Sequence, residues 1–191
     1  MTTVTGTGKR IEHAAEVTAS PDRFSTSYDS YDYHERNKYN FLKSGRQWFG
    51  ERFDYSVFDT TFTFPGLLTA EPVKLKANVL SRSSATKSFI FTSGGVAVGA
   101  ISVTNVILSN STGVYANQKS GIFTFTATGD AVNVHIDYNK TLSSDEGYLD
   151  YLTINARSRL NKTGSVLFFR DSRMTGAGHV ALYAISNCSA A

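Results

Sequence analysis

Short runs in which apolar and polar residues alternate dominate this chain. Residues 73–80 alternate almost strictly and place Val73, Leu75, Ala77 and Val79 on one side, which predicts a strand with one buried face. Similar runs recur at intervals of about ten residues, separated by turn-forming residues. They predict strands over residues 56–64, 73–80, 87–92, 96–102, 121–128, 131–138, 147–157, 165–170 and 179–185, with weaker candidates over 103–109 and 114–117. Since no segment has the period of an amphipathic helix, we expect an all-β fold, an antiparallel β-sandwich or jelly roll of about ten strands.

Two dipeptides, Gly94-Gly95 and Gly129-Asp130, each separate a pair of predicted strands. Gly and Asp are favoured in tight hairpin turns because such turns require positive φ angles. We therefore expect two β-hairpins, of which the one around Gly129-Asp130 is the clearer.

Residues 147–157 form the longest predicted strand, around which the others are organised. Bulky residues on both sides indicate a central strand. One side carries Tyr148, Asp150, Leu152, Ile154 and Ala156, and the other carries Leu149, Tyr151, Thr153, Asn155 and Arg157. Asp150 stands out because burying an unpaired carboxylate costs several kcal/mol. We expect Asp150 to be a buried polar residue that accepts hydrogen bonds from backbone donors of the polar loop 139–146.

Residues 1–40 are polar and contain too few aliphatic residues to build a core of their own. Tyr28, Tyr31 and Tyr33 favour an extended arm that packs onto a neighbouring domain, whereas the scarcity of apolar residues equally favours a partly disordered linker. The sequence thus predicts an N-terminal arm or linker, residues 1–40, followed by a β-sandwich domain, residues 41–191.

Composition narrows the class of protein. The 191 residues are only 18% charged, below the usual level, which is typical of extracytoplasmic β proteins. The net charge of +3 is scattered, so no nucleic-acid partner is expected. No apolar run approaches the roughly 18 residues of a membrane span, and the start lacks the apolar core of a secretory signal. The chain is either cytoplasmic or a piece of a longer exported protein, and its end directly after a predicted strand favours the piece.

The only tryptophan marks the candidate binding motif. Trp48 stands with Phe49 and Phe53 between Arg46 and Arg52. Such a cluster is a possible stacking platform for sugars or bases, with Trp48, Arg46 and Arg52 as the binding residues. The alternative, which we favour, is an aromatic core cluster with the arginines folded over it.

Catalytic and metal-binding chemistry is sparse. The four histidines lie far apart in the sequence, and the single cysteine, Cys188, is close to the end. Asp145, Glu146 and Asp150 form the best cluster of calcium-ligand type, but adjacent carboxylates in a Ser-rich loop more commonly form a solvated turn. The Gly-rich stretches lack the Lys and the helix of a phosphate loop. We therefore expect no enzyme activity from this chain, no metal and no cofactor.

Two motifs carry a resemblance to a known family. Residues 44–54, Ser-Gly-Arg-Gln-Trp-Phe-Gly-Glu-Arg-Phe-Asp, and residues 147–157, Gly-Tyr-Leu-Asp-Tyr-Leu-Thr-Ile-Asn-Ala-Arg, together resemble the PorU family. These are the cell-surface sortases (C-terminal signal peptidases) of the type IX secretion system in Bacteroidetes, which are gingipain-type cysteine peptidases. Residues 167–171 and 185–188 resemble the part of that family just ahead of the peptidase domain. The second motif is also similar to strands of sugar-binding sandwiches.

The resemblance implies a non-catalytic β-sandwich module that supports a downstream cysteine peptidase domain and helps to dock cargo C-terminal signal domains. The catalytic Cys and His of the family would lie beyond residue 191, so no catalytic residue is carried over. Implied partners are the adjacent domains of the parent chain, cargo signal domains and other secretion-system surface proteins. The implied location is the outer-membrane cell surface after export, without membrane insertion. The alternative is a carbohydrate- or lipopolysaccharide-binding sandwich, suggested by the low charge, Trp48 and the many tyrosines.

Overall fold

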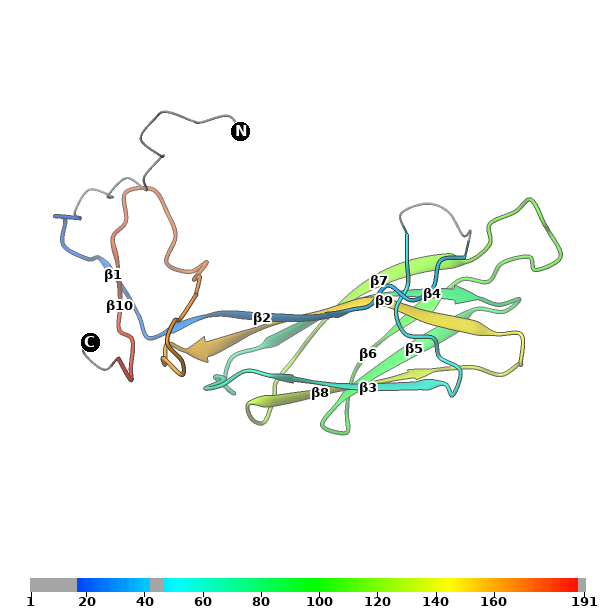
Figure 1. Cartoon of the computed structure of the whole chain (residues 1–191), viewed down its shortest axis with the longest axis horizontal. Helices are drawn as coiled ribbons and strands as arrows, with labels where there is room; N and C mark the ends of the chain where they lie inside the picture. The colour runs from blue at the N-terminus through cyan, green and yellow to red at the C-terminus, as the bar shows by residue number, and fades with distance from the viewer. Residues whose placement is uncertain (1–16, 42–46, 189–191) are drawn as a thin grey trace, which may run out of the picture.

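The computed structural model describes residues 17–41 and 47–188 of the chain. This part forms ten strands and no helix. The strands are β1 (Arg23–Ser25), β2 (Ser27–Glu35), β3 (Val57–Thr63), β4 (Val73–Arg82), β5 (Lys87–Ser93), β6 (Val96–Val103), β7 (Asn117–Phe125), β8 (Ala131–Tyr138), β9 (Glu146–Arg159) and β10 (Ala181–Tyr183). Eight of them build two four-stranded sheets, ordered β2-β9-β4-β7 and β3-β8-β5-β6, which lie one above the other in Figure 1. All neighbours within these sheets are antiparallel. The predicted all-β antiparallel sandwich is confirmed.

Alternate residues of the strands fill the space between the two sheets. The inward residues of β4 are those that the alternation predicts, and each is almost fully buried. The largest contributions to this core come from Leu75, Phe53, Phe89, Phe91, Ile136, Tyr138, Leu149, Leu152 and Ile154. Fully burying one such aliphatic or aromatic side chain contributes about 1.5–3 kcal/mol. The outer faces of the sheets carry polar residues, aromatic residues and a few exposed aliphatic residues, among them Ile90 and Ile122.

The central strand predicted over residues 147–157 is confirmed, because β9 pairs with β2 on one side and β4 on the other. Its predicted faces are correct only in part. A β-bulge opposite β4 inserts Asp150 as an extra residue. Because one extra residue reverses the alternation, Leu149 and Leu152 both point into the core.

The two predicted hairpins have different outcomes. β5 and β6 pair through Gly94-Gly95, whose φ angles are 57° and 80°, so this hairpin is confirmed. The hairpin at Gly129-Asp130 is wrong, because β7 pairs with β4 in one sheet while β8 pairs with β3 and β5 in the other. Asp130 holds this crossing turn by accepting the backbone N–H groups of Gly66 (3.1 Å) and Leu67 (3.0 Å). Turn chemistry predicted the change of direction, whereas the pairing partner depends on the assembly of the sandwich.

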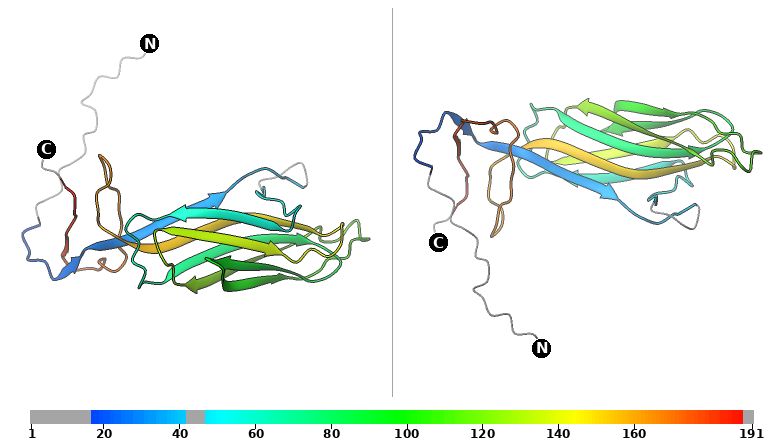
Figure 2. Two further views of the ribbon diagram at one scale, coloured as in Figure 1. Left: turned by 90° about the horizontal axis from the view of Figure 1, so that it is seen from below. Right: turned by 90° about the horizontal axis from the view of Figure 1, so that it is seen from above.

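Four other predicted strands are wrong or shorter. Residues 104–116 form a loop instead of the strands expected over 103–109 and 114–117, and residues 165–170 are not a strand. The strand expected over 179–185 is reduced to β10, which pairs in parallel with β1. We call β1, β10 and residues 160–180 the C-terminal extension. It lies beyond one end of the sandwich (Figure 2).

Residues 27–35 belong to the segment predicted as an arm or linker, and in the structure they form β2, an edge strand of the sandwich. β2 pairs with β9 in unbroken register, from Ser27 opposite Arg159 to Glu35 opposite Tyr151. Only one of its residues, Ser30, is buried. An edge strand that contributes so little to the core lacks the apolar alternation by which strands are recognised in a sequence. Residues 1–16 of the predicted arm lie outside the described residues.

Gly99 of β6 permits the close approach of β7 at one side of the sandwich. A Cβ atom at this position would overlap the ring of Phe123 on β7. We expect Gly99→Ala to displace this ring and to lower the free energy of unfolding by about 1–3 kcal/mol, the usual cost of overpacking. Gly129→Ala is the control, because a Cβ atom there meets nothing within 4 Å. Equal urea midpoints for the two variants would contradict this prediction.

Candidate binding surface

The outer face of the sheet β2-β9-β4-β7 carries two adjacent rows of the same composition. Across β2, β9 and β4 the rows read Tyr31–Asn155–Lys74 and Tyr33–Thr153–Lys76. Because neighbouring strands are about 4.8 Å apart, each row is about 10 Å wide. We call these six residues, together with Tyr151 and Arg170, the tyrosine–lysine face.

The rings and cations of this face hold one another in place. The rings of Tyr31 and Tyr33 are stacked, with 6.1 Å between centroids and 25° between planes. The Arg170 guanidinium lies 5.8 Å from the centre of the Tyr31 ring, and the Lys76 ammonium lies 5.5 Å from that of Tyr151. Such cation–π contacts restrict the positions of the charged groups.

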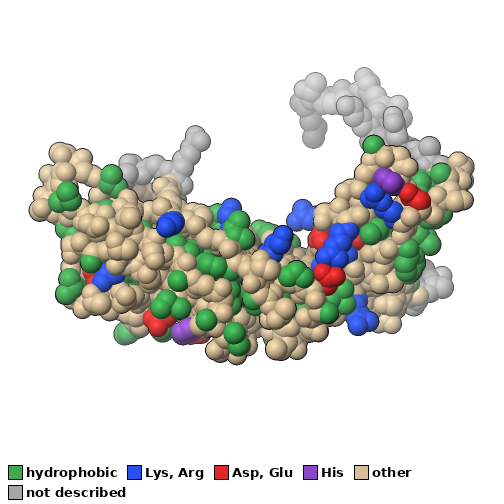
Figure 3. Space-filling view, turned by 180° about the vertical axis from the view of Figure 1, so that it is seen from behind, with side chains coloured by type: hydrophobic (Ala, Val, Ile, Leu, Met, Phe, Trp, Pro, Cys, Tyr) green, Lys and Arg blue, Asp and Glu red, His purple; other side chains and the backbone are tan. Residues whose placement is uncertain are grey.

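A groove of about 480 Å³ borders the tyrosine–lysine face along β2. It is lined by residues 28–32 and 63–65 of the sandwich and by residues 168–170 of the C-terminal extension. The N–H of Asp29 donates to the carbonyl of Arg170 at 2.9 Å, which attaches the extension to the edge of β2. Figure 3 shows the surface hollowed between the two ends of the molecule, with Lys and Arg side chains along the hollow.

Two carboxylates, those of Glu35 and Asp150, lie at one end of the positively charged tyrosine–lysine face. Asp150 is half-buried, and its Oδ2 accepts hydrogen bonds from Asn78 Nδ2 and Gln118 Nε2, both at 3.0 Å. Burial, with a smaller effect of the Glu35 carboxylate, raises the pKa of Asp150. The donors are therefore side-chain amides of β4 and β7, and not the expected backbone groups of loop 139–146, because the bulge turns Asp150 toward these strands.

Loop 139–146 instead encloses Asp145, whose side chain is fully buried. This carboxylate accepts hydrogen bonds from Ser83 Oγ (2.7 Å) and from the N–H groups of Thr141 (3.0 Å) and Leu142 (2.8 Å), and Lys87 Nζ lies 2.6 Å away. Burial alone would raise the pKa, but the Lys87 ammonium and these donors outweigh it and hold the pKa of Asp145 far below its usual value. The solvated turn expected here is wrong for Asp145, because the loop folds over the carboxylate. The described residues contain no group of three or more metal-ligand side chains that could hold a metal ion.

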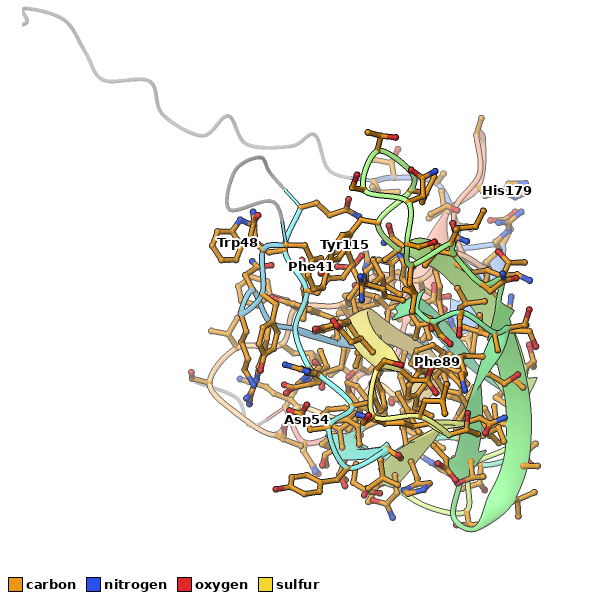
Figure 4. All side chains as sticks on the ribbon, turned by 90° about the vertical axis from the view of Figure 1, so that its right-hand side faces the viewer. Phe41, Trp48, Asp54, Phe89, Tyr115 and His179 are labelled. Atoms are coloured by element: carbon orange, nitrogen blue, oxygen red, sulfur yellow. The ribbon has the colours of Figure 1, made fainter. Side chains whose placement is uncertain are left out.

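In the structure, the three aromatic residues of the motif around Trp48 lie in different places. Phe53 belongs to the main core and Phe49 to a smaller aromatic cluster, whereas Trp48 is 43% exposed. Figure 4 shows Trp48 projecting outward past Phe41 and Tyr115. The phenylalanines therefore follow the core interpretation, and Trp48 is left on the surface.

Only one of the two arginines of that motif lies within the described residues. Arg46 lies outside the described residues. Arg52 pairs with Asp54, with 2.8 Å between Nε and Oδ1, and its guanidinium lies 6.0 Å from the centre of the Tyr148 ring. Arg52 is thus folded over an aromatic residue of the smaller cluster, as the core interpretation predicts.

Each described histidine lies beside a carboxylate. The pairs are His34–Glu51 (3.3 Å), His135–Asp59 (2.7 Å) and His179–Asp22 (2.6 Å). Cys188 is exposed, and none of these three histidines is hydrogen-bonded to it or to a serine. Residues 17–41 and 47–188 thus present no cysteine or serine that is hydrogen-bonded to a histidine, and His13 lies outside them.

Sequence reasoning missed a buried ion network at the other end of the tyrosine–lysine face. Arg157, only 6% exposed, donates from Nη1 to Asp29 Oδ1 (2.7 Å) and to Asp171 Oδ1 (2.6 Å). Asp171 also accepts a hydrogen bond from Ser25 Oγ at 2.9 Å. Burial opposes ionisation, but hydrogen bonds from Ser172 and Arg157 lower the pKa of Asp29 to about 2. The sequence does contain a signal for this network. Arg157 lies within a strand that carries bulky residues on both sides, and a cation buried in such a strand requires carboxylate partners.

The structure defines the chain as an antiparallel β-sandwich with an extension attached to its edge strand. A similar fold is found in the crystal structure of dimeric latent PorU from Porphyromonas gingivalis, with a TM-score of 0.72 over 90% of this chain at 15% sequence identity. The matched region is 16% of that PorU chain. The fold of this chain is therefore PorU-like.

Two carbohydrate-binding modules match less well. One is the module CBM36 in complex with calcium and xylotriose (TM-score 0.34, 12% identity, 51% of this chain and 71% of that one). The other is the CBM36-1 domain of a multidomain xylanase from the hindgut metagenome of Trinervitermes trinervoides (TM-score 0.39, 12% identity, 66% and 95%). Scores this low carry no argument. No protein-family model and no curated protein matches the sequence. A helix able to span a membrane is not found among the described residues.

Proposed function

We propose that this chain is a non-catalytic β-sandwich module of a PorU-type sortase of the type IX secretion system. The extent of the structural match carries the proposal. Residues 27–159 contain the whole sandwich, and a match over 90% of the chain is longer than this segment. A likeness between unrelated sandwiches would be limited to the sandwich. The match therefore takes in part of the C-terminal extension.

In this role the module supports the cysteine peptidase domain of its parent protein and helps to dock cargo C-terminal signal domains. The catalytic Cys and His belong to another part of the parent. Its partners are the adjacent domains, the cargo signal domains and other surface proteins of the secretion system. The protein is exported and acts at the outer-membrane cell surface.

The source gene provides the first test. We expect the reading frame to encode a signal peptide upstream of residue 1 and a Cys/His peptidase domain downstream of residue 191. Deletion of residues 17–188 from the parent should then abolish cargo processing, while the peptidase domain still cleaves a short peptide. Stop codons on both sides, or unchanged cargo processing after the deletion, would contradict the proposal.

A second candidate function, binding of a carbohydrate or lipopolysaccharide, is favoured by the exposed Tyr31 and Tyr33, which lie beside cations that form no ion pair within the described residues. Aromatic rings flanked by hydrogen-bonding side chains are a common surface for sugars. We expect saturable binding of the folded chain on a broad glycan array. A folded chain that binds no glycan would contradict this function and leave the sortase-module proposal untouched.

A further inference from the structure

We propose that the tyrosine–lysine face is the binding site, and that its ligand is an acidic oligosaccharide whose anionic groups are held by Lys74, Lys76 and Arg170. This inference rests on the second candidate function. It places the site on the outer face of the sheet β2-β9-β4-β7, and not on the motif around Trp48.

Among residues 17–41 and 47–188, none of the three cations has a carboxylate partner. The ion pairs of the described residues use other cations, so Lys74, Lys76 and Arg170 are not neutralised within this part of the chain. Elsewhere on the molecule the carboxylates Glu51, Asp145 and Asp171 are each paired. Unpaired cations that share one face attract an anionic ligand.

Two of these cations are also held in position. Lys76 lies over the ring of Tyr151 and Arg170 lies over that of Tyr31. A flexible Lys or Arg side chain loses rotamer freedom when it binds a ligand, and contacts that restrict it beforehand reduce this loss. The face is therefore partly arranged for binding in the free protein.

The repeated rows indicate a polymer with a repeating charge. Each row offers a phenol, then Asn155 or Thr153, then a lysine, and the rows are two residues, or about 7 Å, apart along the strands. The amide, hydroxyl and phenol groups donate and accept hydrogen bonds, as the hydroxyl groups of sugars do. A chain of acidic sugars presents hydroxyl and anionic groups in this alternating way.

Single-stranded nucleic acid fits this face less well, because neighbouring side chains already cover the tyrosine rings. Base recognition requires free aromatic faces on which the bases stack. Here Tyr31 is contacted by both Tyr33 and Arg170, and Tyr151 is covered by Lys76. What the face offers outward is mainly hydroxyl and charged groups.

An extended peptide fits this face less well. Peptides that add to a sheet use unpaired backbone groups at a strand edge. The tyrosine–lysine face is the flat side of the sheet, where β9 and β4 are paired on both edges. Recognition here depends on side chains alone.

Calorimetric titration of the full chain at low salt tests the proposal. The ligand is an oligogalacturonate, and its fully methyl-esterified form is the neutral control of the same length. We expect binding of the acid only, weakened as NaCl screens the charges. In the double variant Lys74→Gln/Lys76→Gln we expect at least a tenfold loss of affinity, since about 1.4 kcal/mol corresponds to tenfold and charge-assisted hydrogen bonds reach this size.

Two matched variants make the result specific. Lys119→Gln removes a lysine of the same sheet that lies opposite the core-facing Val79, on the other face, and it should bind as the wild type does. Trp48→Ala should also bind normally. Equal urea midpoints establish that every variant is folded.

The outcomes separate the proposals. Binding of the acid that survives Lys74→Gln/Lys76→Gln but is lost in Trp48→Ala would keep the glycan function and overturn this site. Equal binding of the acid and its ester would overturn the role of charge. Tighter binding of an oligonucleotide of matched charge would replace the glycan by nucleic acid and overturn the inference. Absence of binding to oligogalacturonate and to sulfated heparin oligosaccharides would overturn the inference, whereas the second candidate function would fail only if the folded chain also bound no glycan on the broad array.

Discussion

Asp145→Ala is expected to lower the free energy of unfolding by about 3–5 kcal/mol, the usual cost of removing one partner of a buried ion pair. The substitution leaves the Lys87 ammonium, whose side chain is 3% exposed, without its carboxylate at 2.6 Å. It also removes the acceptor for the N–H groups of Thr141 and Leu142 that close loop 139–146. Urea unfolding at neutral pH measures the effect.

Two further variants identify the cause. Asp137→Ala removes an exposed carboxylate from β8 and should change stability by less than about 0.5 kcal/mol. The double variant Asp145→Leu/Lys87→Met removes both buried charges, so it should be more stable than Asp145→Ala. If Asp145→Ala unfolds at the same urea concentration as Asp137→Ala, the buried pair does not stabilise the fold.

The same carboxylate makes stability depend on pH. The pKa of Asp145 is lower in the folded than in the unfolded chain, so its contribution is complete above the unfolded value of about 4. That contribution is lost as the pH falls from there toward the folded value, because the unfolded chain then takes up the proton first. The wild type should therefore lose stability below about pH 4 more steeply than Asp145→Asn does.

Arg157→Met is expected to lower the free energy of unfolding by about 3 kcal/mol or more, because it leaves two carboxylates without their cation. One of them, Asp171, has a fully buried side chain. Since Asp171 belongs to the C-terminal extension and Arg157 to β9, the substitution also weakens the attachment of the extension to the sandwich. Trypsin should then cleave after Arg170 or Arg173 faster than in the wild type.

Arg159→Met is the matched control, because Arg159 lies two residues further on the same side of β9 and is exposed. It should leave both the urea midpoint and the trypsin pattern unchanged. A variant Arg157→Met that is as stable as Arg159→Met, and equally resistant to trypsin, would show that the network does not hold the extension.

The two buried ion pairs explain why the polar parts of this chain were the hardest to interpret from sequence. The sequence predicts a buried carboxylate at Asp150, whereas the structure leaves Asp150 half-buried and buries Asp145 fully. The sequence predicts a solvated Asp145 because its neighbours are Ser143, Ser144 and Glu146. Its partners, Ser83 and Lys87, come from the turn before β5 and from β5 itself, and no pattern within the loop indicates them.

The pattern of apolar and polar residues by itself determined the class of fold, the strands β3, β4, β5, β6, β8 and β9, and the turn at Gly94-Gly95. These features depend on local chemistry: alternation of period two, β-branched and aromatic residues, and glycines with positive φ. Only the tertiary structure decided the rest. β2 is a strand because β9 offers it an edge, β7 and β8 separate because each completes a different sheet, and Asp150 is displaced by a bulge. The tyrosine–lysine face combines residues of β2, β4 and β9 with Arg170, and their proximity follows from strand order, which local sequence does not encode.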